Sequence, residues 1–199
     1  MKRKLSLAAA LLLVCTSAYA QHEHEKKPAA PPMDPAMEAM MKAGMPGEQH
    51  KKLGTMAGSW TAKVSMWMGP GTEPMLSDGT STSQWVLDGR YLEQRFHGSM
   101  MGTPFDGLGY TGYDNLKQQY WATWMDSGST GVFLATGSAT DAKTMSFSGT
   151  MADPMTGKDT TTETRLLLTD ADHHTMEMWG PAPDGKNFKM MEIRYTRKK

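Results

Sequence analysis

The chain has 199 residues with 21 basic and 21 acidic side chains, so it has no net charge, which excludes a nucleic-acid binder driven by bulk attraction to phosphates. Hydrophobic residues make up 39% of the chain, enough to form the core of one domain. The 20 glycines are typical of a chain with many tight turns, and a single cysteine excludes an internal disulfide.

The first twenty residues have the pattern of a secretory signal peptide. A basic start at residues 2–4 precedes an apolar run at residues 5–14, shorter than the roughly 20 residues that a membrane span needs. The sequence Ala-Tyr-Ala at 18–20 matches the small-residue cleavage rule. We therefore expect cleavage after Ala20 and a mature protein in the periplasm or outside the cell, with no membrane span. Lipidation of Cys15 is disfavoured because large apolar residues precede it.

Residues 21–33 are polar and then proline-rich, which predicts a flexible linker. A helical segment is expected over residues 34–57. Asp34 and Pro35 suit the start of a first helix, and Gly44 suits its end. A second short helix is expected to turn Leu53 and Met56 inward.

Methionines recur on one face of the first predicted helix. Their spacing approximates i, i+4, i+7 and i+8, a helical stripe that predicts packing by adaptable apolar side chains. The alternative is a copper site, because thioethers bind Cu(I) and the nearby His22 and His24 offer nitrogen ligands. The stripe consists of Met33, Met37, Met40, Met41 and Met45.

From residue 58 to the C-terminus, short β-rich runs alternate with turn dipeptides such as Asp78-Gly79 and Asp88-Gly89. Because no helical pattern separates these runs, we predict an all-β fold: an antiparallel up-and-down barrel of about ten strands, in which closure removes the edge strands. A β-sandwich has a similar sequence pattern and remains the alternative. The predicted strands are 60–68, 80–87, 91–99, 105–113, 118–125, 131–137, 144–151, 159–168, 175–179 and 187–197.

The sequence Gly58-Ser-Trp60 begins the first predicted strand after a short helix, and Arg197 ends the last. This arrangement resembles the calycin superfamily, which includes lipocalins and fatty-acid-binding proteins. More specific segments, including PGEQHKKLGTMAGSW, MWMGPG and WVLDGRYLEQRFHGSMMGTPFDGLGYTGYDN, resemble the secreted bacterial family called domain of unknown function 1579. The resemblance implies a calycin-like barrel whose closed end holds Trp60 beneath Arg197, and it implies no activity.

Candidate ligand-binding residues are found on three strands. Three charged or titratable residues near position 95 share one strand face by their spacing of two. Facing inward they would orient a ligand carboxylate, and facing outward they are ordinary solvent-side residues. Two further candidates near position 125 share a face, and another lies on the Trp60 face of the first strand. The candidates are Met66, Glu93, Arg95, His97, Trp124 and Asp126.

No enzyme motif is present: the sequence lacks G-x-S-x-G, H-E-x-x-H, a P-loop and C-x-x-C. We expect no cofactor, and we interpret His173-His174 beside Asp170 and Asp172 as a polar turn rather than a metal site. The leading hypothesis is a barrel that binds a small apolar or amphipathic ligand. The alternatives are a metal-handling protein and a structural envelope protein whose barrel is filled by side chains.

Overall fold

The computed structural model describes residues 33–153 and 156–199. The predicted signal peptide, its cleavage site and all but the last residue of the predicted linker lie outside the described residues, as do His22 and His24.

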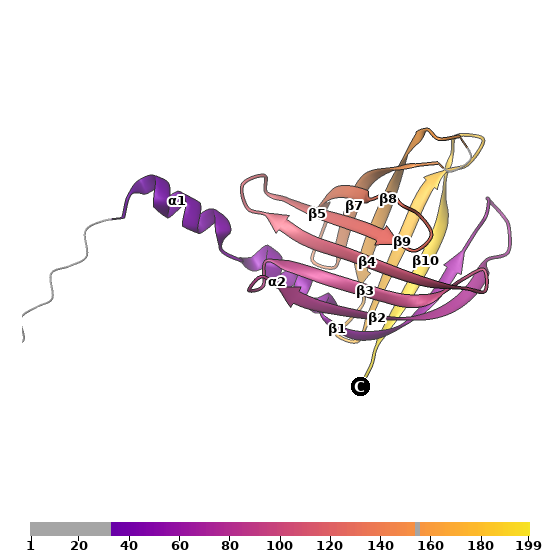
Figure 1. The fold of residues 1–199 in the computed structure, drawn as a ribbon, viewed down its shortest axis with the longest axis horizontal. Helices are drawn as coiled ribbons and strands as arrows, with labels where there is room; N and C mark the ends of the chain where they lie inside the picture. Colours follow the sequence, from indigo (N-terminus) through magenta and orange to yellow (C-terminus); the bar gives the residue numbers. More distant parts are fainter. Residues whose placement is uncertain (1–32, 154–155) are drawn as a thin grey trace, which may run out of the picture. The chain divides into compact units, whose positions relative to one another are not determined.

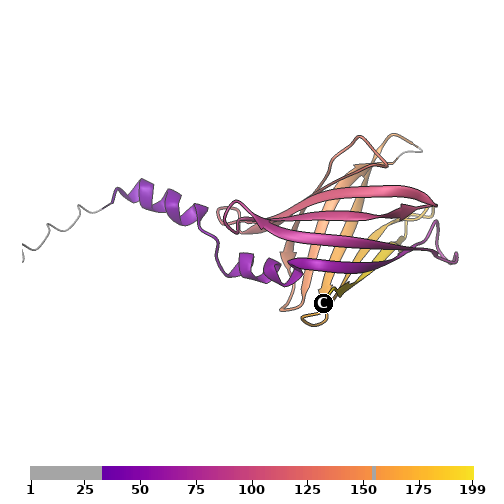
Figure 2. The ribbon, with the colours of Figure 1, turned by 60° about the horizontal axis from the view of Figure 1, so that its bottom comes forward.

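Ten antiparallel strands form a closed barrel in which each strand pairs with its sequence neighbours and β10 returns to pair with β1 (Figures 1 and 2). The predicted barrel is therefore confirmed and the sandwich alternative is wrong. The strands are β1 Gly58–Met66, β2 Met75–Val86, β3 Tyr91–Met100, β4 Thr103–Asp114, β5 Gln119–Asp126, β6 Phe133–Ala139, β7 Thr144–Ala152, β8 Asp159–Leu168, β9 His173–Pro181 and β10 Asn187–Arg197.

The barrel interior, called the lumen below, is lined by alternate residues of each strand. In β1, Trp60, Ala62 and Val64 are buried, whereas the residues between them are exposed. The register continues this pattern across the β1–β10 pair, where Ala62 lies opposite Tyr195 and Val64 opposite Ile193. Period-two alternation therefore separates a lumen that is mostly apolar, with a few buried hydroxyls, from a polar outer face.

The predicted turn at Asp78-Gly79 is wrong, because both residues lie inside β2. Gly79 faces the lumen, and a Cβ there would lie 2.5 Å from the ring of Phe96. A glycine in a strand here makes room for an aromatic ring from the next strand rather than reversing the chain.

The N-terminal helical segment consists of α1 Pro35–Gly44, α2 Glu48–Leu53 and the 3-10 turn Gly54–Met56. Leu53 and Met56 are buried in the core as predicted. Asn115 donates hydrogen bonds to the carbonyls of Ala43 and Met45 at the end of α1. Neither described helix is long and apolar enough to cross a membrane.

Candidate functional site

One end of the barrel is closed around Trp60, at the start of β1. The Trp60 side chain is 1% exposed, and its indole Nε1 donates a 3.0 Å hydrogen bond to the Met56 carbonyl. The guanidinium carbon of Arg197 lies 4.0 Å from the Trp60 ring centre. This is the stacked geometry that the family resemblance implied, and it suits arginine because the guanidinium is planar and weakly hydrated.

Arg197 also fastens the helical segment to the barrel. Its guanidinium donates to the carbonyls of Thr55 at 3.1 Å, Ala57 at 2.8 Å and Ala171 at 2.9 Å. Gly58 makes this approach feasible, because a Cβ there would lie 2.4 Å from Nη1 of Arg197. Gly58 also has a φ of 126°, which side chains other than glycine rarely adopt. The Gly-x-Trp sequence therefore provides both the space and the ring that the arginine needs.

The interpretation of His173-His174 as a polar turn is wrong, because both residues begin strand β9. His173 is exposed and its Nδ1 lies 2.9 Å from Asp170, but His174 faces inward from β9. The His174 ring meets Trp60 edge-on at 4.4 Å and stacks on Tyr195 at 4.4 Å. The sequence around His174 is polar, so it did not indicate that the His174 side chain faces into the closed end of the barrel.

Burial has a clear electrostatic consequence for His174. Loss of solvent, reinforced by the positive charge of Arg197, lowers the pKa of His174 to about 4. The ring is therefore neutral in the folded protein at neutral pH. Its buried Nδ1 has no hydrogen-bond partner in the protein.

Two lumen hydroxyls on β8 also lack partners. Thr162 is 1% exposed, and Thr162 Oγ1 and Thr164 Oγ1 are both buried without a hydrogen-bond partner in the protein. The register places Met178 of β9 opposite Thr164. Gly180 of the same strand lies close to both Thr162 and Met190, because a Cβ there would be 3.6 Å and 2.7 Å from their side chains. On β7, Gly149 lies opposite Thr162 and Phe147 opposite Thr164, so the two hydroxyls sit in a wall of glycine, methionine and phenylalanine.

The end of the barrel opposite α2 is called the mouth below. The register places Met66, Trp124 and Asp126 on the inner face here, and all three are partly exposed. The Trp124 indole donates a 2.9 Å hydrogen bond to Asp126, which also accepts from the Gly128 amide. The Trp124 ring lies against Gly107, where a Cβ would be 2.2 Å from it. A small hollow of about 90 Å³ at the rim is lined in part by Met66, Met75 and Met100.

The other three candidates lie on the outer face of β3. Glu93 accepts 2.8 Å hydrogen bonds from the Tyr110 hydroxyl and the Arg95 guanidinium, and His97 lies 2.5 Å from Asp106. The hydrogen bond from Tyr110, assisted by Arg95, lowers the pKa of Glu93 although burial opposes this. Leu92 and Phe96 of β3 are in the core, so the alternating residues Glu93, Arg95 and His97 face outward. The alternative in which they face the lumen is wrong. The six candidates do not form one site, because Met66, Trp124 and Asp126 belong to the mouth and the rest to the outer surface.

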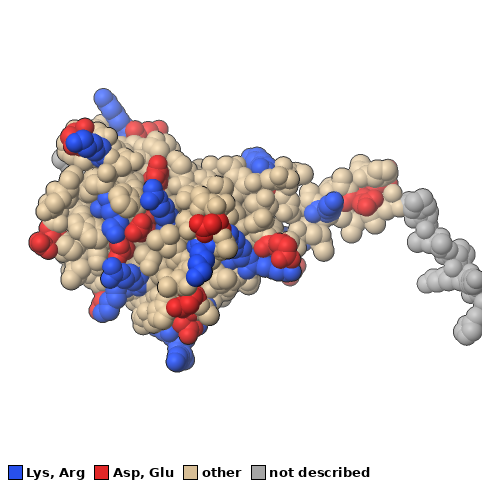
Figure 3. Space-filling view, turned by 180° about the vertical axis from the view of Figure 1, so that it is seen from behind, with Lys and Arg blue, Asp and Glu red and all other residues tan. Residues whose placement is uncertain are grey.

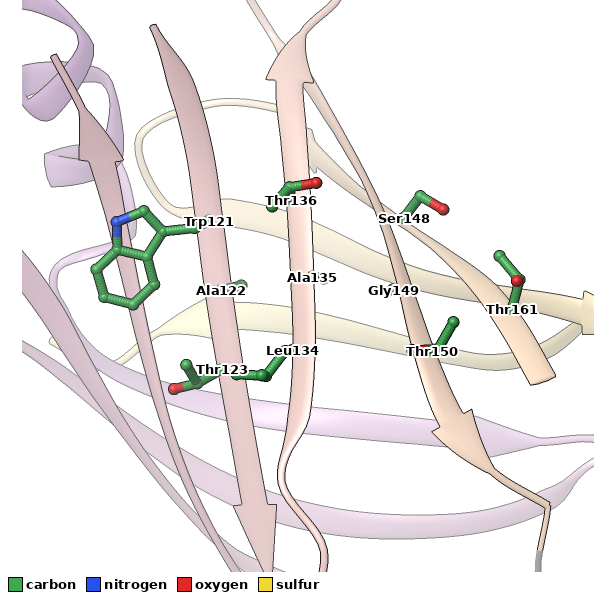
Figure 4. Close-up of a pocket in the computed structure, with 10 residues that line it drawn as sticks. All are labelled: Trp121, Ala122, Thr123, Leu134, Ala135, Thr136, Ser148, Gly149, Thr150 and Thr161. Atoms are coloured by element: carbon green, nitrogen blue, oxygen red, sulfur yellow. The ribbon is translucent and has the colours of Figure 1, made fainter. Parts of the chain in front are cut away.

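A larger hollow of about 460 Å³ lies on the outside of strands β5 to β8 (Figure 4). It was not predicted from the sequence. Its lining has no ionisable side chain, and alternating threonines and serines on the outer face provided the only sequence signal. The lining residues are Trp121, Ala122, Thr123, Leu134, Ala135, Thr136, Ser148, Gly149, Thr150 and Thr161.

Figure 3 shows acidic and basic side chains intermingled on the face it presents, without a region of one sign. Among residues 33–153 and 156–199, no three His, Cys, Asp or Glu side chains are grouped so that they could hold a metal ion.

The sequence profile of a family described as "protein of unknown function (DUF1579)" matches residues 45–197. A comparison with curated proteins finds no match. Among solved structures, the chain resembles Rv2717c from M. tuberculosis, with a TM-score of 0.55, 14% identity and coverage of 77% of this chain and 99% of that one. It also resembles the S-type phycobiliprotein lyase CPES from Guillardia theta, with a TM-score of 0.55, 12% identity and coverage of 80% and 97%. At these identities the likeness shows the barrel fold alone.

Proposed function

The chain belongs to the DUF1579 family, and from its barrel we propose that it binds a small ligand that enters at the mouth and occupies the lumen. We place this activity in the periplasm or outside the cell, because the N-terminal sequence has the pattern of a cleaved signal peptide.

The observation that carries this proposal is the pair of unpartnered hydroxyls, Thr162 and Thr164. Leaving a buried polar group without a hydrogen bond costs about 1–3 kcal/mol. Valine would fill the same space without that cost, since it has the same branched shape. A ligand carrying a hydroxyl or carbonyl group supplies the missing partner, which gives these two threonines a reason to face the lumen.

The charges around the lumen favour an uncharged ligand. Asp126 is occupied by Trp124 and Gly128, Arg197 by three backbone carbonyls, and His174 is neutral at physiological pH. No described lumen side chain therefore offers a free positive charge to a ligand carboxylate. Burying an unpaired charge is far more costly than burying a hydrogen-bonded hydroxyl.

Methionine side chains fit the walls of such a site. Met176, Met178 and Met191 face inward on β9 and β10 and are partly exposed. Methionine has three rotatable bonds and a polarisable sulfur, so it repacks around an apolar guest at little cost. Ligand entry would thus displace methionines rather than require a rigid preformed cavity.

The proposal is tested by titrating the mature protein with the neutral dye Nile red and displacing it with dodecan-1-ol or dodecanoate. We expect the alcohol to displace the dye at least about tenfold better than the acid, and a Thr162→Val/Thr164→Val variant to bind the alcohol about tenfold more weakly. Thr150→Val/Thr161→Val is the matched control, because these threonines line the outer hollow. Absence of dye binding, or equal losses in both variants, would contradict a lumen site and favour a purely structural barrel.

Thr162→Val should stabilise the ligand-free protein, because it removes the unpartnered hydroxyl and keeps the side-chain shape. We expect the free energy of unfolding in urea to rise by about 1–2 kcal/mol. Thr161→Val, one residue away on the outer face, should change it by less than about 0.5 kcal/mol. A Thr162→Val protein that is less stable than wild type would show that the hydroxyl is already satisfied.

A further inference from the structure

The methionines between residues 33 and 45 are all exposed, and α1 buries none of its residues. Within the described part of the chain, the packing role that the sequence favoured for these methionines is therefore wrong. The exposed fractions are Met33 52%, Met37 48%, Met40 64%, Met41 52% and Met45 60%. An explanation is needed for thioethers that no described part of the protein covers.

The only large apolar residues of this stretch are methionines, which indicates that the sulfur atom matters here rather than hydrophobicity alone. Between residues 33 and 47 there is no leucine, isoleucine, valine or aromatic residue. Leucine has the same helix propensity as methionine and would serve an apolar docking face equally well. A helix that lies on membranes is rich in Lys and Arg with Trp, Phe or Leu opposite, whereas α1 has one basic residue, Lys42.

We infer that Met37, Met40 and Met41 on α1 form a binding site for Cu(I). Met40 and Met41 each lie about one turn from Met37, with their Cβ atoms about 5–6 Å from that of Met37, so flexible side chains can bring three sulfurs to one ion. Thioethers are soft, neutral ligands that select Cu(I) over Zn²⁺ and the hard cations. Because a thioether has no proton to lose on binding, the site would also function in acidic surroundings.

The test is an anaerobic competition for Cu(I) between the mature protein and bicinchoninate, read from the colour of the bicinchoninate complex. We expect one Cu(I) per chain and at least about a tenfold loss of affinity in Met37→Leu/Met40→Leu/Met41→Leu. This variant should fold normally, because α1 contributes no buried residue. It retains His22 and His24, so copper binding that survives the substitutions would point to the histidines and overturn the proposal.

The matched control is Met68→Leu/Met75→Leu/Met101→Leu, which removes exposed methionines from the barrel and its loops. It should retain the wild-type affinity for Cu(I). Two results would overturn the site: no Cu(I) retained against bicinchoninate, or an equal loss of Cu(I) affinity in the control. If no Cu(I) is retained, and wild type and the α1 leucine variant bind phosphatidylglycerol vesicles equally, the face belongs to a membrane surface.

Discussion

Replacing Trp60 by alanine is expected to lower the free energy of unfolding by about 3–5 kcal/mol, a large part of the 5–15 kcal/mol typical of a whole domain. The side chain is almost fully buried, its indole nitrogen bonds the Met56 carbonyl, and its ring meets His174. Truncation would leave a cavity at the point where the helical segment meets the barrel. Urea unfolding followed by circular dichroism measures the effect.

Two arginines of β10 provide the graded controls for this prediction. Arg197→Ala loses the cation over the indole, worth about 0.5–2 kcal/mol, together with the hydrogen bonds to three carbonyls, and should lower the melting temperature without preventing folding. Arg194→Ala should matter less still, because Arg194 is exposed on the outer face and pairs there with Glu192. A Trp60→Ala variant that is as stable as Arg197→Ala would contradict this account of the closed end.

The second large effect is a loss of stability in mild acid that arises from His174. Burial lowers the pKa of His174 to about 4 in the folded protein, whereas an unfolded histidine titrates near 6.5. The unfolded state therefore gains a proton first as the pH falls. Stability is complete above about pH 6.5 and declines down to about pH 4, by about 3 kcal/mol in all.

A His174→Phe variant isolates this contribution, because it retains an aromatic ring between Trp60 and Tyr195 but cannot titrate. Its free energy of unfolding should fall much less than that of wild type between pH 6.5 and 4.5. His173→Phe is the matched control at the adjacent, exposed position, and its free energy of unfolding should fall by more than that of His174→Phe over the same pH range. If both variants show the wild-type slope, His174 is not the group responsible. Carboxylates such as Glu93, whose pKa is lowered, affect both proteins equally at lower pH.

The barrel could be predicted from sequence because its determinants are local. Turn residues and period-two alternation act within a few residues and indicated the strands, whereas the closed end around Trp60 and Arg197 was implied by the family resemblance. Asp78-Gly79 shows where local reasoning fails. Asp-Gly forms a turn elsewhere in the chain, but here it lies inside β2, where Gly79 makes room for the Phe96 ring of the next strand.

The site was less predictable because it depends on which face of a strand is inside and on what lies across the lumen. Charge alone could not decide the orientation of Glu93, which is nearly buried yet faces outward beneath Tyr110 and Arg95. The missing partners of Thr162 and Thr164 are a property of distant strands. No sequence pattern reports the absence of a hydrogen bond.

Native mass spectrometry of the mature protein isolated from its own cells tests the central proposal most directly. The account predicts a mass that exceeds the polypeptide by one uncharged small molecule, released on denaturation and retained less well by Thr162→Val/Thr164→Val. A polypeptide that carries nothing, and that takes up no dodecan-1-ol added before the measurement, would contradict a ligand-binding lumen.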